Sequence, residues 1–344
     1  MNDLVSIIIP MHNTLLKDFL RCYESITNQT YPNIEIVIVN DRSDKSHLNE
    51  ILKIAKKNPN VLFLNADGIG VSCARNTGVK YSHGAYIMFM DSDDILNYMA
   101  ISEAVEILES CNLDIVAGRY KSFSEEEIEL ANPDFETYDK KVEIINTDNR
   151  EKAWAEFFQW NQRHQIFDGW AFWPLPSWMR LLRRSICSDV LFPPGIEISE
   201  DTIWNFRLLK KPSVKIGLAN CNWYAYIQHT SSVAHTIYLD HPDKVIASLE
   251  CLGEEFSDEK SEFYNYYLSH VYRELKIILE KGFYIRDYGN FLQKYFEFFE
   301  LCNKRLLKKI NFRNIKPAKL RMKYLLFRSG MAYPWYALKS VLPI

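Results

Sequence analysis

Two hydrophobic periods alternate through the first 118 residues, and this alternation restricts the fold more than any other feature. Runs rich in β-branched residues are typical of strands buried on both faces. Between them, apolar residues recur at helical spacing. Strands are predicted at 4–9, 34–39, 61–64, 85–90 and 114–117, and helices at 16–26, 48–55, 71–81 and 104–108. This order predicts an α/β fold whose mostly parallel sheet carries helices on both faces.

The remainder of the chain is less regular. Residues 119–150 are polar and acidic, which predicts a surface excursion. Helices are predicted near 151–160 and 200–210. Beyond about residue 240 strand signals fade, and residues rich in Phe, Tyr and Leu predict a helical C-terminal appendage.

The cysteines argue against a disulfide or zinc framework. There are seven of them, widely spaced and without a CxxC pair. This pattern favours a reducing compartment. The first ten residues, MNDLVSIIIP, have no basic stretch before the apolar run, so no signal peptide is predicted. No apolar run approaches the ~18 residues of a membrane span.

The small net charge of −3 conceals a strong asymmetry. Residues 304–344 contain eleven Lys and Arg and no Asp or Glu, which leaves 30 basic and 44 acidic residues elsewhere. Because large apolar residues interleave with these basic ones, the tail is predicted to dock on an anionic membrane surface. The alternative is a basic face packed on the acidic body. No nucleic-acid motif accompanies the charge.

Polar side chains follow four of the predicted strands. Ligands of open α/β sheets bind beyond the carboxyl ends of the strands, so these side chains are candidates for a binding site. The residues at these strand ends are Pro10, His12 and Asn13 after the first strand, Asn40, Asp41 and Arg42 after the second, Gly68, Gly70 and Arg75 after the third, and Asp91, Asp93 and Asp94 after the fourth.

Three of these carboxylates lie within four residues, in Asp91-Ser92-Asp93-Asp94. They repel one another unless a cation sits among them. A hard divalent ion with oxygen ligands, Mn²⁺ or Mg²⁺, would relieve the repulsion and also hold a diphosphate. The alternative is acids near a helix N-terminus, which explains one or two carboxylates better than three. Neither a Walker A loop nor a GxGxxG motif is present.

Four motifs in this order resemble the inverting family 2 glycosyltransferases of the GT-A fold: VSIIIPMHN, EIVIVNDRSD, GIGVSCARNTG and MFMDSDD. The resemblance is close over 4–118 and looser to about 235, through WMRLLRRSI, LFPPG and SEDTIW. It implies a Rossmann-like mixed sheet flanked by helices. It also implies a metal-dependent hexosyltransferase that moves a sugar from a nucleoside diphosphate sugar to a glycan hydroxyl.

The resemblance implies donor-binding roles for several residues. Asp41 matches the Asp that contacts the base; it suits the imide N–H of uracil, although guanine also offers donors. Pro10, His12 and Asn13 would line the same pocket. Arg42 stands where the family usually has Gly. The donor would also meet Arg75 and the DxD motif, with Asp91 nearer the ribose and Asp93 on the metal.

The resemblance also implies catalytic residues. Glu200 and Asp201 match the family's Glu-Asp pair, and Asp201 is predicted to be the general base that deprotonates the acceptor. The alternative is that Ser199–Thr202 merely caps a helix. His229 lies where the family folds a loop over the phosphates and is a candidate metal ligand, in competition with His235.

Tryptophans are concentrated between residues 154 and 178. Trp170, Trp173 and Trp178 lie in or beside a Gly/Pro-broken stretch and are candidates to stack on acceptor sugars. Burial in a subdomain core is the equal alternative.

Together these features predict a catalytic domain at 1–238, with a nucleotide-sugar-binding half at 1–118 and an acceptor-binding half at 119–238, followed by a helical region at 239–344. The predicted enzyme uses a UDP-sugar in bacterial capsule, lipopolysaccharide or related polysaccharide synthesis. It would be a cytoplasmic protein, peripheral on the inner face of the membrane. The alternatives are a sugar nucleotidyltransferase, which would need a Gly-rich basic loop after the first strand, and a non-catalytic partner that binds nucleotide sugar or membrane.

Overall fold

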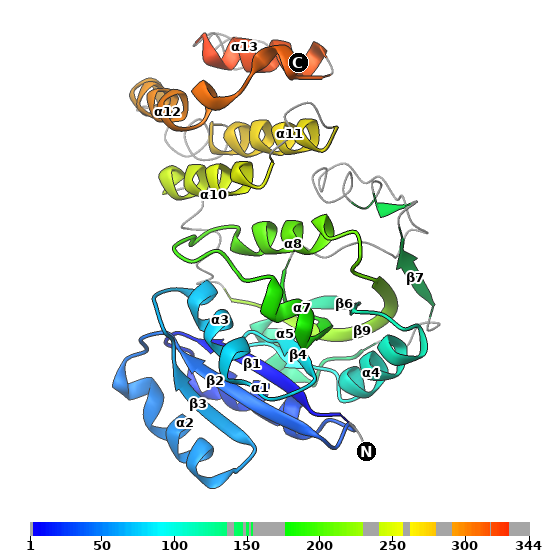
Figure 1. Cartoon of the computed structure of the whole chain (residues 1–344). Coiled ribbons are helices and arrows are strands. Elements are labelled where there is room, and N and C mark those ends of the chain that lie inside the picture. Colours follow the sequence, from blue (N-terminus) through cyan, green and yellow to red (C-terminus); the bar gives the residue numbers. More distant parts are fainter. Residues whose placement is uncertain are drawn as a thin grey trace. The chain divides into compact units, whose positions relative to one another are not determined.

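The computed structural model describes residues 3–135, 141–146, 149–150, 153, 176–229, 241–256, 262–279, 291–316 and 318–329. The chain divides into two compact units (Figure 1). The first, here the α/β unit, comprises residues 1–157 and 163–231. The second, here the helical unit, comprises 158–162 and 232–344.

A mixed sheet forms the centre of the α/β unit. Its described strands are β1 (Val5–Met11), β2 (Ile34–Asn40), β3 (Val61–Asn65), β4 (Tyr86–Phe89), β5 (Ile95–Leu96), β6 (Ile115–Ser124), β7 (Val142–Ile145), β8 (Arg180–Arg183) and β9 (Ile216–Gln228). Their order is β3-β2-β1-β4-β8-β6-β9-β5, and β7 also pairs with β9. The pairs of β1 with β2 and β4, and of β2 with β3, are parallel. β8 runs antiparallel to β4 and β6, which makes the sheet mixed.

The helices follow the predicted order. Those described in the α/β unit are α1 (Leu16–Thr27), α2 (Lys45–Lys57), α3 (Val71–Tyr81), α4 (Ala100–Ser110), α5 (Glu125–Leu130), α7 (Arg184–Asp189) and α8 (Glu200–Lys210). The strand and helix predictions for the first 118 residues, and the helix at 200–210, are therefore confirmed. The helix predicted near 151–160 lies outside the described residues.

Both faces of the sheet are covered. Ile7 and Ile9 of β1 belong to one apolar core together with Phe19 of α1. Ile8, between them, faces α3, where a Cβ on Gly78 would lie 2.3 Å from its Cγ2 atom. Only glycine therefore permits this close approach of α3 to the sheet. Burial on both faces explains why β1 reads as a continuous apolar run.

The prediction of a surface excursion at 119–150 is wrong for its first part. β6 continues to Ser124 and pairs in parallel with the much later strand β9. The acidic stretch that follows is α5, which begins with a capping box between Ser124 and Glu127. Phe123 and Ile128 are buried. Pairing with a strand about a hundred residues away overrode the polar local sequence.

The helical unit contains α10 (Pro242–Glu254), α11 (Glu262–Ile277), α12 (Phe291–Arg305) and α13 (Ala318–Arg328), with short 3₁₀ turns at Leu307–Lys309 and Phe312–Asn314. Buried tyrosines link these helices. Tyr267 donates a hydrogen bond to the Leu249 carbonyl, and Tyr324 donates one to the Leu268 carbonyl. In the described part of the chain, no helix is both long and apolar enough to span a membrane.

Candidate active site

The loops after β1 and β2 are bonded to each other. The Asn13 N–H donates to Ser43 Oγ at 3.0 Å, and the Asp44 N–H donates to Asn13 Oδ1 at 2.8 Å. His12 Nδ1 lies 2.7 Å from the Asp41 carbonyl oxygen. Parallel pairing of β1 with β2 brings these loops together, so three of the residues predicted to line a base pocket are neighbours in space.

Asp41 has an unused acceptor beside these loops. Its Oδ1 atom is buried and has no hydrogen-bond partner. A buried acceptor without a partner is costly, so it is suited to a ligand that brings an N–H. The next residue, Arg42, has φ +58°, a backbone conformation that favours glycine. The loop therefore keeps the conformation expected of the glycine that usually stands here.

The carboxylates of the Asp91–Asp94 segment have different surroundings. Asp94 is buried, and its two oxygens accept hydrogen bonds from the Tyr224 hydroxyl at 2.6 Å and the Ile227 N–H at 2.8 Å. Burial raises its pKa well above the usual value. The Asp91 N–H donates to the same Tyr224 hydroxyl. Asp94 thus fastens the segment to β9, whereas Asp93, with its side chain 40% exposed, remains open.

Arg75 is the electrostatic centre of the site. Its side chain is 4% exposed, and its guanidinium lies 2.9 Å from Glu200 Oε1, 3.0 Å from Asp201 Oδ1 and 3.4 Å from Asp91 Oδ1. The guanidinium carbon is also 5.1 Å from the centre of the Phe192 ring. One cation on α3 therefore joins a carboxylate after β4 to both acids at the head of α8.

One guanidinium does not balance three carboxylates. Burial, opposed by Arg75, raises the pKa of Asp91 to about 6. Burial and the neighbouring Asp201 carboxylate raise the pKa of Glu200 to about 7. Burial alone would lower the pKa of Arg75, but the three acids raise it above its usual value. The carboxylates around Arg75 therefore outnumber the positive charge that it supplies.

His229 stands beside Asp93. Its Nε2 atom is 3.3 Å from Asp93 Oδ2 and makes no hydrogen bond, and its Nδ1 atom is 2.7 Å from Glu125 Oε1. Asp93, followed by Glu125, raises the pKa of His229 to about 9. In this arrangement the imidazole takes the place of a cation next to Asp93. Glu125 could not be found from the local sequence pattern, because its approach depends on the pairing of β6 with β9.

The predicted metal ligands Asp91, Asp93 and His229 fit a site in which the substrate supplies the remaining ligands of the ion. Carboxylate oxygens and an imidazole nitrogen are ligands that Mn²⁺ accepts. Among the described residues, no cluster of three or more His, Cys, Asp or Glu side chains is arranged to hold an ion alone. A hard ion held by one or two carboxylates commonly completes its coordination with substrate phosphates and water.

The head of α8 presents Asp201 to the site. The Ser199 side chain makes no capping hydrogen bond, and its backbone is left-handed, with φ +60°. Asp201 Oδ2 accepts the Ser177 N–H at 3.2 Å. The Asp201 carbonyl accepts a hydrogen bond from Asn205. The side chain is thus turned toward Arg75 while the helix continues behind it.

The predicted acceptor residues are only partly described. Trp170, Trp173 and His235 lie outside the described residues. Trp178 is 5% exposed, and its ring stacks on that of Tyr224, with centroids 4.3 Å apart. Its ring packs within the core of the α/β unit, and its role in acceptor binding stays a prediction.

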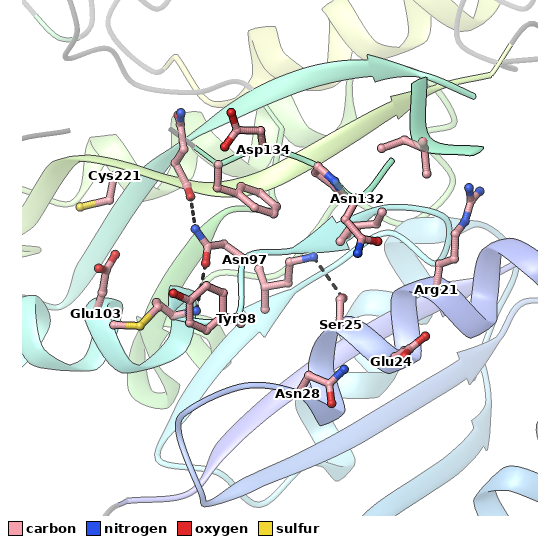
Figure 2. A pocket seen from close by; sticks show the side chains of 17 residues that line it. Arg21, Glu24, Ser25, Asn28, Asn97, Tyr98, Glu103, Asn132, Asp134 and Cys221 are labelled. Atoms are coloured by element: carbon pink, nitrogen blue, oxygen red, sulfur yellow. Dashed lines mark hydrogen bonds between the residues drawn. The ribbon is translucent and has the colours of Figure 1, made fainter. Parts of the chain in front are cut away.

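A cavity of about 600 Å³ lies elsewhere in the α/β unit, between α1, β5 and the segment after α5. Figure 2 shows its lining, with Asn97 bonded to the Asn222 carbonyl and the Ser25 hydroxyl bonded to a backbone N–H of β5. No predicted site residue lines it. The convergent charges, and not this cavity, mark the candidate active site.

The model of the family described as glycosyl transferase family 2 matches residues 6–191, which is more than half of the chain. The protein therefore belongs to this family. Glu200, Asp201 and His229 lie beyond the matched segment. Glycosyltransferase GlyA of Streptococcus pneumoniae is 27% identical over 226 residues, which cover 65% of this chain and 30% of GlyA. The uncharacterized glycosyltransferase EpsJ of Bacillus subtilis is 29% identical over 273 residues, which cover 78% of this chain and 71% of EpsJ. The chain therefore spans less than a third of GlyA.

A solved structure shares the fold. S. aureus TarS residues 1–349 in complex with UDP-GlcNAc match with a TM-score of 0.60 and 16% sequence identity, covering 96% of this chain and 92% of that chain. The predicted fold, a GT-A mixed sheet flanked by helices with a helical C-terminal part, is confirmed.

Proposed function

We propose that the protein transfers a sugar, with inversion, from a UDP-sugar to a hydroxyl of a glycan acceptor, and that it needs a divalent metal ion. The observation that carries this proposal is the convergence of Asp91, Glu200 and Asp201 on Arg75. It brings the carboxylate expected near the donor and the expected general base to the same guanidinium.

The chemistry follows from that placement. Inversion needs a single displacement, in which the acceptor oxygen attacks the anomeric carbon as the bond to the diphosphate oxygen breaks. Asp201 accepts the proton of the acceptor hydroxyl, and the nucleoside diphosphate leaves. Arg75 holds Asp201 in place and supplies positive charge beside the leaving group.

Asp93, Asp91 and His229 would hold the metal ion. When bound, the ion stabilises negative charge on the leaving diphosphate, which is worth several kcal/mol. The fit is supported by the closeness of His229 Nε2 to Asp93 Oδ2, at 3.3 Å, and by the excess of carboxylates around Arg75.

The base pocket favours uracil. The unpartnered Oδ1 of Asp41 can accept the imide N–H of that base. The UDP-GlcNAc complex of TarS, which shares the fold, supports the same choice. Membership of family 2 supports an acceptor in capsule, lipopolysaccharide or related polysaccharide synthesis, with Trp170 and Trp173 as candidate acceptor contacts.

A nucleotide-sugar panel tests the donor. We expect UDP-sugars, with Mn²⁺ present, to raise the melting temperature; a bound donor stabilises the protein by roughly 2.7 kcal/mol at a hundredfold excess over its Kd. Asp41→Ala should lose this shift, whereas Asp44→Ala, at an exposed neighbouring carboxylate, should keep it. A shift with GDP-sugars alone would contradict the uracil assignment, and binding without transfer or hydrolysis would favour a non-catalytic partner.

We also propose that the protein docks on the inner face of the cell membrane through α13. Two basic residues nearby are already neutralised, since Arg305 and Lys309 pair with Glu250 of α10. On α13, by contrast, Lys319, Met322, Lys323 and Leu326 are exposed at helical spacing, and Met322 is 62% exposed. The Lys323 ammonium also lies 5.1 Å from the centre of the Tyr272 ring. Exposed apolar and basic residues on one helix suit an anionic lipid surface.

Vesicle flotation tests the proposed membrane binding through α13. Each basic residue near an anionic surface contributes about 1 kcal/mol, so Lys319→Glu with Lys323→Glu should weaken binding at least about tenfold. Lys56→Glu with Lys57→Glu, an exposed pair on α2, is the matched control and should float like the unmodified protein. Binding should rise with anionic lipid and weaken with salt. If the unmodified protein does not float with anionic vesicles at low salt, the proposed membrane binding is wrong.

A further inference from the structure

We propose that Glu125 is a positioning residue that orients His229 toward the metal ion. This inference rests on the proposed function, because it assumes that Asp93 and His229 hold the ion. It assigns a task to the first residue of α5, which lies in the segment that the sequence presented as a surface excursion.

The sheet brings Glu125 to His229. β6 and β9 are parallel, and Ser124, the last residue of β6, pairs with Gln228, the last residue of β9. Glu125 directly follows Ser124, and His229 directly follows Gln228. Parallel neighbours with this register leave the sheet side by side at the same edge, so the two side chains meet just beyond it.

The contact has the geometry of a carboxylate that supports a metal-binding histidine. Glu125 Oε1 is 2.7 Å from Nδ1, which leaves Nε2 facing Asp93 Oδ2 at 3.3 Å. The His229 side chain is only 15% exposed, and Nε2 has no hydrogen bond. In the neutral imidazole that an ion would select, donation of the Nδ1–H to Glu125 would direct the lone pair of Nε2 to the space beside Asp93.

Both partners are held in place independently. The capping box of α5 uses Ser124 and Glu127, and so leaves the Glu125 side chain available for His229. On the other side, Asp94 accepts the N–H of Ile227, two residues before His229. The carboxylate, the imidazole and Asp93 thus come from three separate segments: the start of α5, the end of β9 and the segment between β4 and β5.

Mn²⁺ binding tests this role on the full-length protein. The Kd for Mn²⁺ would be measured in the presence of UDP from the free-ion electron paramagnetic resonance signal. Loss of a supporting carboxylate typically costs 10–100-fold in metal affinity, so we expect that range for Glu125→Ala. At saturating Mn²⁺ its kcat should return close to that of the unmodified protein. Glu125→Gln keeps an acceptor oxygen and should lose less. Glu126→Ala, at the next and exposed residue of α5, should lose nothing.

The outcomes separate this inference from the proposed function. If His229→Ala weakens Mn²⁺ binding and Glu125→Ala does not, the positioning role is wrong while the metal site stands. If the unmodified protein binds no Mn²⁺ with UDP, the metal proposal fails and this inference fails with it. Equal losses in Glu125→Ala, His229→Ala and the double variant would support a shared role. Melting temperatures near that of the unmodified protein would exclude unfolding as the cause.

Discussion

Asp201→Asn should lower the rate of sugar transfer by roughly two orders of magnitude or more while leaving the affinity for the UDP-sugar nearly unchanged. The substitution keeps the size of the side chain and one acceptor oxygen but removes its basicity. Arg75 and the Ser177 N–H donate to different oxygens of Asp201, so the single amide oxygen keeps one of these two contacts. Loss in kcat without loss of binding is the signature of an interaction needed only for the chemical step.

The measurement is the transfer rate at saturating donor, with donor affinity determined separately by calorimetry. Asp189→Asn, at an exposed carboxylate that pairs with Lys211, is the control and should transfer at the normal rate. If the Asp201→Asn variant also transfers sugar at the normal rate, Asp201 serves only the structure of α8, and another residue must be the general base.

Asp93→Ala should abolish turnover and metal-dependent nucleotide binding together. Asp94 is bonded to Tyr224 and Ile227, and Asp91 shares its carboxylate with Arg75. Asp93, with its side chain 40% exposed, is therefore the carboxylate of this segment most open to an ion. Without the ion, the diphosphate would meet the excess negative charge of the site unscreened.

UDP binding with and without Mn²⁺, followed by turnover, measures this effect. Asp67→Ala, at an exposed carboxylate that pairs with Lys80, provides the control. Full activity of the unmodified protein in excess EDTA would contradict the metal requirement at once. If Asp93→Ala still binds UDP in a Mn²⁺-dependent way, the ion must be held by ligands other than Asp93.

The sequence predicted the donor-binding half well because its structure is local. Each strand there is a continuous apolar run next to its partner in the βαβ order, and the polar residues after those strands had to meet at one edge. Asp41 and Asp91 could be found in this way from the sequence alone.

The second half depends on pairings that the local pattern does not encode. The sequence of β6 is polar beyond Arg119, yet this strand pairs with β9, which comes about a hundred residues later in the chain. That pairing places Glu125 beside His229, and neither residue type nor spacing predicts it. Two of the three ion pairs of Arg75, those with Glu200 and Asp201, likewise join segments more than a hundred residues apart. The aromatic richness was ambiguous for a similar reason, since burial of Trp178 against Tyr224 depends on where β9 lies.

The ion pairs of Arg75 also limit how this protein can be recombined with its relatives. Arg75 and Asp91 belong to the first 118 residues, whereas Glu200 and Asp201 are supplied by the later part of the same unit. A chimaera that keeps the first part and imports the second from another enzyme would bury a guanidinium without two of its acids. Breaking a buried ion pair in this way costs about 3–5 kcal/mol. Exchange of donor-binding halves between such enzymes is therefore workable only when the imported part brings its own acidic pair at the head of the helix that replaces α8.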